Sequence, residues 1–299
     1  MARVSSIRLL LLHAFVLLLS LVALLPATAR ASAGELLARY AELQGELRNN
    51  DFGHALHIDS SETPERLTGD VYAMLEHPFA TVSDALRDPA RWCDILILPF
   101  NTKYCHAMES ASGPVLQVRI GRRYDQPVER AYRLHFAWTA VAARRDYFET
   151  RLQAAEGPVG THDYRIAVSA IPLENGRTFL RLNYSYAVGL AGRMAMQLYL
   201  GTAGADKVGF TVVGRDGQGR PQYIGGVRGA IERNAMRYYL AIDAYLDSLR
   251  APPELQVERR IRLWFAATER YPRQLQEMDA NTYVTMKRAE VQRQQTPLE

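Results

Sequence analysis

The chain has 299 residues, 48% of them hydrophobic, and a formal net charge of +4 at pH 7. Arg3, Arg8 and Arg30 supply three of these charges within residues 1–33, a segment without acidic residues, so the remainder carries only +1. Such a balance gives no electrostatic basis for non-specific nucleic-acid binding, which needs many Lys or Arg contacts to phosphate. The length allows one large domain or two small ones.

The first 33 residues have the pattern of a secretory signal peptide. Arg3 and Arg8 precede the apolar run Leu9–Leu25, and two A-x-A sites follow within residues 27–33. A positive start, an apolar middle and a small-residue end are the three parts of such a peptide. We therefore expect export to the periplasm with cleavage of residues 1–33. An uncleaved Leu9–Leu25 that anchors the protein in the membrane is the alternative.

Cys93 and Cys105 are the two cysteines of the chain. In an oxidising compartment an even number of cysteines favours pairing, so we predict a disulfide between them. Two buried free thiols are the alternative. A catalytic thiol is disfavoured because His106, the adjacent candidate base, would point to the opposite face of a strand.

The first elements after this segment are a helix, two strands and two short helical pieces. Helical spacing over residues 34–49 predicts an amphipathic helix with Leu36, Leu37, Tyr40, Leu43 and Leu47 near one face. Strand-like runs follow at 54–60 and 67–76, and the helical pieces lie at 79–86 and 90–92, around Asp88-Pro89.

The middle of the chain is rich in strand-like runs separated by turn residues. They cover residues 96–108, 115–124, 132–142, 147–154, 164–172 and 178–188. Alternation places Tyr132, Leu134, Phe136 and Trp138 on one face of their strand, and Leu180, Leu182, Tyr184 and Tyr186 on one face of theirs. Asn175-Gly176 supplies the positive φ angles of a tight hairpin. Short connections of this kind predict an antiparallel sheet, because parallel strands need long crossovers.

The last third of the chain is mainly helical. We expect a helix at 190–203, short strands at 208–214 and 222–225, and a long helix at 229–249. The apolar stripe of the long helix contains Ile231, Ala235, Tyr238, Ile242, Tyr245 and Leu249. Pro252-Pro253 ends this helix, and two further helices should lie within residues 254–291.

Common signatures of enzymes and cofactor sites are absent from the sequence. The glycine-rich stretch 201–229 lacks the G-K-[ST] of a phosphate loop, and neither G-x-S-x-G nor H-E-x-x-H occurs. His54 and His57 would point to opposite faces of a strand, which makes them a poor metal pair. We therefore expect no metal and no cofactor.

Two compositional features remain. Many of the sixteen tyrosines lie on the predicted apolar faces, where they could line a cavity and orient a polar head group, or simply pack the sheet against the helix. Arginines also occur on strand faces, at positions 119, 133, 165 and 181. Most of them should be solvated, and one that points inward would need an anionic partner.

The order of elements resembles the helix-grip fold of the START and birch-allergen superfamily over residues 54–250. The resemblance is carried by strand 69–75, which leads into the helical pair ending at Trp92-Cys93-Asp94, and by residues 233–242, which enter the long helix. It implies an α+β fold in which a curved antiparallel sheet grips a long C-terminal helix. Members of the superfamily typically hold lipids, sterols or polyketides between sheet and helix, and a minority are cyclases or aromatases.

The chain departs from this pattern at three places. It begins with a signal peptide, has a helical C-terminal extension after Pro252-Pro253, and carries an added helix at 190–203 that could act as a lid. The expected organisation is a signal peptide (1–33), an N-terminal helix (34–53), a helix-grip ligand-binding domain (54–250) and a C-terminal helical extension (251–299).

The first functional hypothesis is a periplasmic binding or carrier protein for a lipid-like hydrophobic ligand. The expected cavity residues are Phe136, Trp138, Tyr184, Tyr186, Tyr238, Ile242 and Tyr245, with Arg181 or Arg237 for a head group.

Two alternatives stay open. One is an enzyme on the same scaffold, of cyclase or isomerase type, in which Tyr, His135 and Arg side chains would polarise a carbonyl or stabilise an enolate. His135 or a Tyr hydroxyl with an orienting partner inside the pocket would favour it, and His135 is its best candidate base. The other is a cell-envelope interaction protein, membrane-bound or docked to an envelope partner through residues 254–291. In that case Trp264 and Phe265 would be exposed, whereas in a structural extension they would pack back on the domain.

Overall fold

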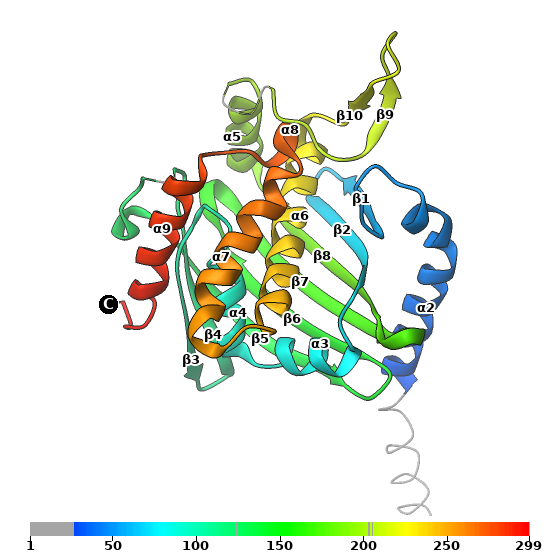
Figure 1. The fold of residues 1–299 in the computed structure, drawn as a ribbon. Coiled ribbons are helices and arrows are strands. Elements are labelled where there is room, and N and C mark those ends of the chain that lie inside the picture. Colours follow the sequence, from blue (N-terminus) through cyan, green and yellow to red (C-terminus); the bar gives the residue numbers. More distant parts are fainter. Residues whose placement is uncertain (1–26, 124, 203, 205, 299) are drawn as a thin grey trace, which may run out of the picture.

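The computed structural model describes residues 27–298 except 124, 203 and 205. It is an α+β fold in which helices cover both faces of a large antiparallel sheet (Figure 1). The predicted fold class is therefore confirmed. The predicted signal peptide falls mostly on residues 1–26, outside the described residues, and stays a prediction. Helix α2 (Ala27–Arg48) includes residues 27–33 as well as the predicted helix.

The large sheet has eight strands in the order β1-β2-β8-β7-β6-β5-β4-β3. Its strands are β1 (Leu56–Glu62), β2 (Arg66–Leu75), β3 (Thr102–Ser110), β4 (Gly113–Ile120), β5 (Tyr132–Ala143), β6 (Phe148–Glu156), β7 (Thr161–Pro172) and β8 (Thr178–Val188). From β3 to β8 each strand pairs antiparallel with the next one in sequence, and β8 returns beside β2. The sheet is not closed, so β1 and β3 form its edges.

The hairpin predicted at Asn175-Gly176 is confirmed. Strands β7 and β8 pair from Pro172 and Thr178 onward, and the turn between them has φ = 64° at Asn175 and 72° at Gly176. Asn and Gly are the residues that adopt this left-handed region at least cost, which explains why the chain reverses here.

One predicted strand is partly wrong. Residues 96–108 were expected to be a single strand, but Leu96 ends helix α4 (Pro89–Leu96) and β3 begins only at Thr102. The Asp88 side chain accepts a hydrogen bond from the backbone N–H of Ala90, and Pro89 occupies the first helical turn, so a helix is started just upstream. An apolar run of this length does not distinguish a buried helix end from a strand.

Helix α6 (Gly226–Ser248) packs against the inner face of the sheet, over β1, β2 and β8. The approach is close at Gly69 on β2, where a Cβ atom would lie 3.2 Å from the Cβ of Ala235 and 3.3 Å from the carbonyl oxygen of Ile231. A larger residue at this position would therefore push the helix away from the sheet. Helices α3 (Phe79–Leu86) and α4 lie at one end of α6 (Figure 1).

Helix α2 covers part of the opposite, outer face. Leu36, Leu43 and Leu47 are buried against a cluster that includes Tyr72 and Phe179. Leu37, which was expected to share this face, is exposed instead. Adjacent residues on a helix point about 100° apart. Because Leu36 faces the sheet, the side chain of Leu37 points away from it.

The C-terminal extension packs back on the domain. It consists of α7 (Pro253–Glu269), α8 (Pro272–Leu275) and α9 (Ala280–Arg293), and α7 runs beside α6 (Figure 1). Trp264 is buried, and its indole N–H donates to the backbone oxygen of Arg237 at 3.1 Å. Phe265 is partly buried, with its ring 5.3 Å from that of Tyr283. These two aromatic residues are therefore not available as an exposed docking face.

A smaller group of elements projects from one end of the molecule (Figure 1). It contains α5 (Leu190–Leu200) and the hairpin β9 (Val212–Arg215) with β10 (Pro221–Tyr223). Three short 3₁₀ turns complete the fold, namely η1 (Val128–Arg130), η2 (Pro158–Gly160) and η3 (Glu174–Gly176).

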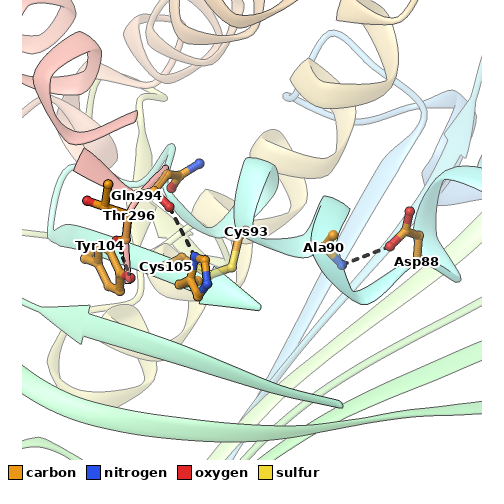
Figure 2. The surroundings of a disulfide bond; sticks show 8 residues. Asp88, Ala90, Cys93, Tyr104, Cys105, Gln294 and Thr296 are labelled. Atoms are coloured by element: carbon orange, nitrogen blue, oxygen red, sulfur yellow. Dashed lines mark hydrogen bonds between the residues drawn. A yellow bond between two sulfur atoms is a disulfide. The ribbon is translucent and has the colours of Figure 1, made fainter. Parts of the chain in front are cut away.

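Cys93 and Cys105 form a disulfide, as predicted (Figure 2). The bond joins α4 to β3, with 5.1 Å between the two Cα atoms. The C-terminal tail lies beside it, where the hydroxyl of Tyr104 donates to the backbone oxygen of Thr296 at 2.9 Å. The disulfide therefore closes the segment that connects α4 to the edge strand.

Reduction of this disulfide should lower the stability of the protein. The two cysteines are separated by 12 residues in sequence, and the loop-entropy estimate for closing such a loop is about 3 kcal/mol. Denaturant unfolding with and without reducing agent measures the loss. A Cys93→Ala, Cys105→Ala variant is the control and should not respond to reductant. Two reactive thiols in unfolded, unreduced protein would contradict the pairing.

Candidate functional site

A cavity of about 330 Å³ lies between the inner face of the sheet and α6. Its walls come from the sheet, from α6, from residues 96–102, and from η2 and α5. The lining residues are Leu96, Pro99, Asn101, Thr102, Val118, Ile120, Leu134, Phe136, Pro158, Tyr164, Tyr184, Met196, Asn234, Arg237 and Tyr238. This volume is at the lower end of the range of small-molecule sites, about 300–1,000 Å³.

A larger hollow of about 640 Å³ lies at the surface, between the end of α2, β1 and the turn from α7 to α8. Its lining includes many charged and amide side chains, among them Glu46, Asn49, Asp51 and Arg270. We take the smaller cavity as the candidate site because it lies between sheet and helix and its lining is predominantly apolar, as expected of a ligand site.

One wall of the cavity is a cluster of tyrosines. The ring centroids of Tyr184 and Tyr238 are 5.1 Å apart, and those of Tyr164 and Tyr184 are 6.2 Å apart. Tyr186 stacks on the far side, with its ring 5.0 Å from that of Tyr164. These spacings are those of favourable aromatic pairs, so the rings support one another.

The hydroxyl groups of this cluster stay protonated at physiological pH. Burial raises the pKa of Tyr164 to about 12, and burial likewise raises the pKa values of Tyr184 and Tyr238. The Tyr164 hydroxyl lies 2.8 Å from the Thr161 hydroxyl. Within the described residues no hydrogen bond reaches the hydroxyls of Tyr184 and Tyr238, which can donate to a carbonyl or carboxylate oxygen of a ligand.

The cavity also has a polar side, formed by Asn101, Thr102, Asn234 and Arg237. The Thr102 hydroxyl oxygen is buried and has no hydrogen-bond partner among the residues that the structure describes. Arg237 donates to Glu277 at 2.7 Å and to the side-chain oxygen of Asn234 at 3.2 Å. The guanidinium is thus held in place at the wall, and the Thr102 hydroxyl is a buried polar group beside it.

The connection between α4 and β3, residues 97–101, is held by the C-terminal helix. We call these residues the cavity loop. Lys287 on α9 is fully buried, and its ammonium donates to the backbone oxygens of Pro99 at 2.7 Å and Thr102 at 2.9 Å. Glu290 pairs with Lys287 at 2.7 Å and with Lys103 at 3.0 Å. Glu290 thus bridges two buried lysines, and the cluster fixes one wall of the cavity to the extension.

The structure brings four of the nine predicted ligand-binding residues to the cavity: Phe136, Tyr184, Arg237 and Tyr238. Four others belong to the core beside it. Trp138 lies on the inner face of β5 past the cavity, Tyr186 stacks against Tyr164, and Ile242 and Tyr245 are buried on α6. Sequence alternation identified the inward face correctly, but not which part of it stays open.

Arg181 lies on the opposite face of the sheet from the cavity. It donates to Asp70 at 2.8 Å, and its guanidinium lies 5.7 Å from the centre of the Tyr72 ring. Arg181 and Tyr72 line a separate polar groove together with residues of α2. The structure therefore does not bring Arg181 and Arg237 to one site.

His135, the best candidate base of the enzyme alternative, is exposed and points away from the cavity, since it alternates with the buried Leu134 and Phe136. Within the described residues, no group of three or more His, Cys, Asp or Glu side chains is placed to hold a metal ion. No helix among those residues combines the length and the apolar content needed to cross a membrane.

Several cavity residues were not predicted from the sequence. Asn101 and Thr102 fell within the misplaced strand, and Met196 lies on a helix whose inward face was not assigned. Tyr164 was placed at the start of a strand, but its face was not assigned. The alternation of Tyr164, Ile166 and Val168 was the signal that could have found it, since all three are buried.

The solved structures that are similar to this chain have low sequence identity to it. No family model matches the chain, and no curated protein matches it. Norcoclaurine synthase from Thalictrum flavum is similar in structure, with 12% identity, a TM-score of 0.35, and coverage of 48% of this chain and 83% of that one.

Two other similar structures have comparable values. One is a START superfamily protein from Mycobacterium smegmatis, with 14% identity, a TM-score of 0.33, and coverage of 46% of this chain and 89% of that one. The other is the human StarD13 lipid transfer and protein localization domain, with 9% identity, a TM-score of 0.33, and coverage of 48% and 76%. Because the identities and TM-scores are this low, these structures say nothing about the ligand or activity of this chain, and its function has to be inferred from its own residues.

The tyrosine cluster predicts a loss of stability at alkaline pH. In the unfolded chain a tyrosine titrates near pH 10, whereas folded Tyr164 titrates near 12. Between these values only the unfolded chain loses this proton, so stability falls as pH rises, by up to about 1.4 kcal/mol per pH unit for this group. Denaturant unfolding at several pH values should show a shallower fall for Tyr164→Phe. Identical pH profiles would contradict the assignment.

The buried cluster on α9 predicts a large effect of Lys287→Ala. The substitution leaves Glu290 with one buried partner and removes the hydrogen bonds that Lys287 donates to the backbone oxygens of Pro99 and Thr102. Breaking a buried ion pair in this way costs about 3–5 kcal/mol. Arg288→Ala is the matched control, because this neighbouring arginine forms a surface pair with Glu258, and such pairs contribute about 0–1 kcal/mol. Equal free energies of unfolding for the two variants would show that the cluster does not hold the loop.

Proposed function

We propose that this protein is a periplasmic binding or carrier protein for a small amphipathic ligand with a hydrophobic body. The observation that carries the proposal is the cavity between sheet and α6. Apolar side chains such as Val118, Leu134 and Phe136 form most of its wall, and the polar groups gather around Thr102 and Arg237. A ligand that buries its apolar body gains about 25 cal/mol per Å² removed from water, and the polar side orients its head group.

The volume limits the size of the ligand. A cavity of about 330 Å³ corresponds to roughly eleven water molecules at about 30 Å³ each. A single ring system or a short chain fits this space, whereas a two-chain phospholipid requires the cavity to widen. The proposed ligand is therefore lipid-like in character but small.

The head group is expected to be an oxygen acceptor, neutral or anionic. The hydroxyls of Tyr184 and Tyr238 are kept protonated by burial, and the Arg237 guanidinium lies at the same wall. All of these groups donate hydrogen bonds. A cationic head group would meet no carboxylate among the lining residues.

Two features support the proposed location. The N-terminal sequence has the three parts of a signal peptide, and the disulfide between Cys93 and Cys105 is of a kind that persists in oxidising compartments. The direct test is the intact mass of the protein recovered from the periplasm. We expect the mass of the chain without residues 1–33.

The experiment for the binding function is native mass spectrometry with solvent extraction of the purified protein. We expect a bound small molecule released on unfolding. Leu134→Trp places a larger side chain in the cavity and should lower the bound fraction about tenfold, the effect of losing roughly 1.4 kcal/mol of binding free energy. His135→Trp is the matched control, because the neighbouring residue points to solvent. Protein that is always empty, or equal occupancy in both variants, would overturn the proposal.

A further inference from the structure

The outer surface of the cavity cover is apolar. Helix α5 turns Met196 toward the cavity, whereas Leu190, Met194 and Leu198 are exposed by 78%, 64% and 70%. These three residues are spaced four apart, so they form one stripe along the helix. A helix that is apolar on its inner side as well as its outer side is not explained by the packing of this chain alone.

The same end of the molecule carries most of the exposed large apolar residues of the described chain. Val159 lies in η2, which contacts α5 through the backbone bond from Gly189 to Gly160, and Val212 and Val213 lie on the β9 strand. Elsewhere such residues are scattered singly, at Leu37, Met108, Val141 and Leu255. Figure 1 shows α5 and the β9–β10 hairpin projecting from one end.

Val159 adds an independent observation. Its φ is 55°, in the left-handed region that β-branched residues rarely adopt, and its side chain is nonetheless exposed. The strain is therefore not offset by burial within this chain. Strained residues of this kind cluster at functional sites, where contact with another molecule explains them.

The charge around this surface favours an anionic partner. Residues 189–228 contain five basic residues and two acidic ones, Asp206 and Asp216, and α5 itself contains no acidic residue. The basic residues are Arg193, Lys207, Arg215, Arg220 and Arg228. Lys207, Arg215 and Arg220 lie within 4.0 Å of the carboxylates of Glu277, Asp51 and Asp216, so the excess positive charge comes from Arg193 and Arg228. Apolar side chains flanked by Lys and Arg are the pattern that inserts into the interface of a bilayer with anionic lipids.

We propose that α5, η2 and the β9 strand form a docking surface for an anionic phospholipid bilayer. Helix α5 and η2 line the cavity through Met196 and Pro158, so docking places this part of the cover of the binding site at the lipid interface, where a hydrophobic ligand enters or leaves. In this respect the inference rests on the proposed binding function.

Local insertion is tested with a fluorophore. Met194→Cys is labelled with an environment-sensitive dye, and because Cys93 and Cys105 are paired, the introduced thiol is the one that reacts. Vesicles of phosphatidylglycerol and phosphatidylcholine in equal parts should shift its emission to the blue. The matched control is the dye at Leu255→Cys, because Leu255 on α7 is exposed by 54% but lies outside the proposed surface, so it should show no shift. A shift at both positions, or at neither, would overturn the proposal.

The affinity is tested by vesicle flotation. Leu190→Gln, Met194→Gln and Leu198→Gln combined should weaken the partition to these vesicles about tenfold or more, whereas Met108→Gln with Leu255→Gln should leave it unchanged. Equal flotation of both variants contradicts the docking surface. A concentration-dependent dimer that the triple substitution abolishes assigns the surface to a second copy and also contradicts it.

Ligand content separates this inference from the proposed function. Each flotation sample is also measured by native mass spectrometry. A protein that carries ligand but does not bind the vesicles refutes the docking surface alone. A protein that binds the vesicles through α5 but never carries a ligand refutes the binding function and still supports the docking surface.

Discussion

The fold depends on covering one wide sheet with narrow helices. Eight strands at about 4.8 Å spacing span roughly 34 Å, whereas a helix with its side chains is about 10–12 Å across. Helix α6 lies over β1, β2 and β8, so the inner faces of β4 and β5 must be covered by other parts of the chain. Helix α4, the cavity loop and α5 complete the cover, and the space left between them and α6 is the cavity. The site is thus a consequence of the mismatch between one helix and eight strands.

The C-terminal extension has a structural part in this cover. Trp264 bonds to the backbone of Arg237, and Glu277 pairs with the Arg237 side chain. Lys287 binds the carbonyl oxygens of Pro99, within the cavity loop, and of Thr102, just after it. The disulfide between Cys93 and Cys105 closes the same segment (Figure 2). Two constraints far apart in sequence therefore fix one wall of the cavity.

Much of the fold could be predicted from the sequence because it rests on local periodicity. Alternation placed Phe136 and Tyr184 on the inner face, the Asn175-Gly176 turn was read from its φ requirement, and the stripe of the long helix identified Tyr238 as inward. The site was predicted only in part, because a cavity depends on which inward residues no helix covers. Trp138 and Ile242 follow the same periodicity as the cavity residues, yet they pack in the core. Arg181 was assigned from its charge, although its own strand alternation places it with Asn183 on the outer face.

The measurement that tests the central claim most directly is a crystal structure of the protein purified with its natural ligand. The account predicts density for a small molecule between α6 and the inner faces of β4, β5 and β8, with its polar end at Thr102 and Arg237 and its apolar body against Leu134 and Phe136. Side chains that fill this space completely, or a ligand bound on the outer face beside Arg181, would contradict it.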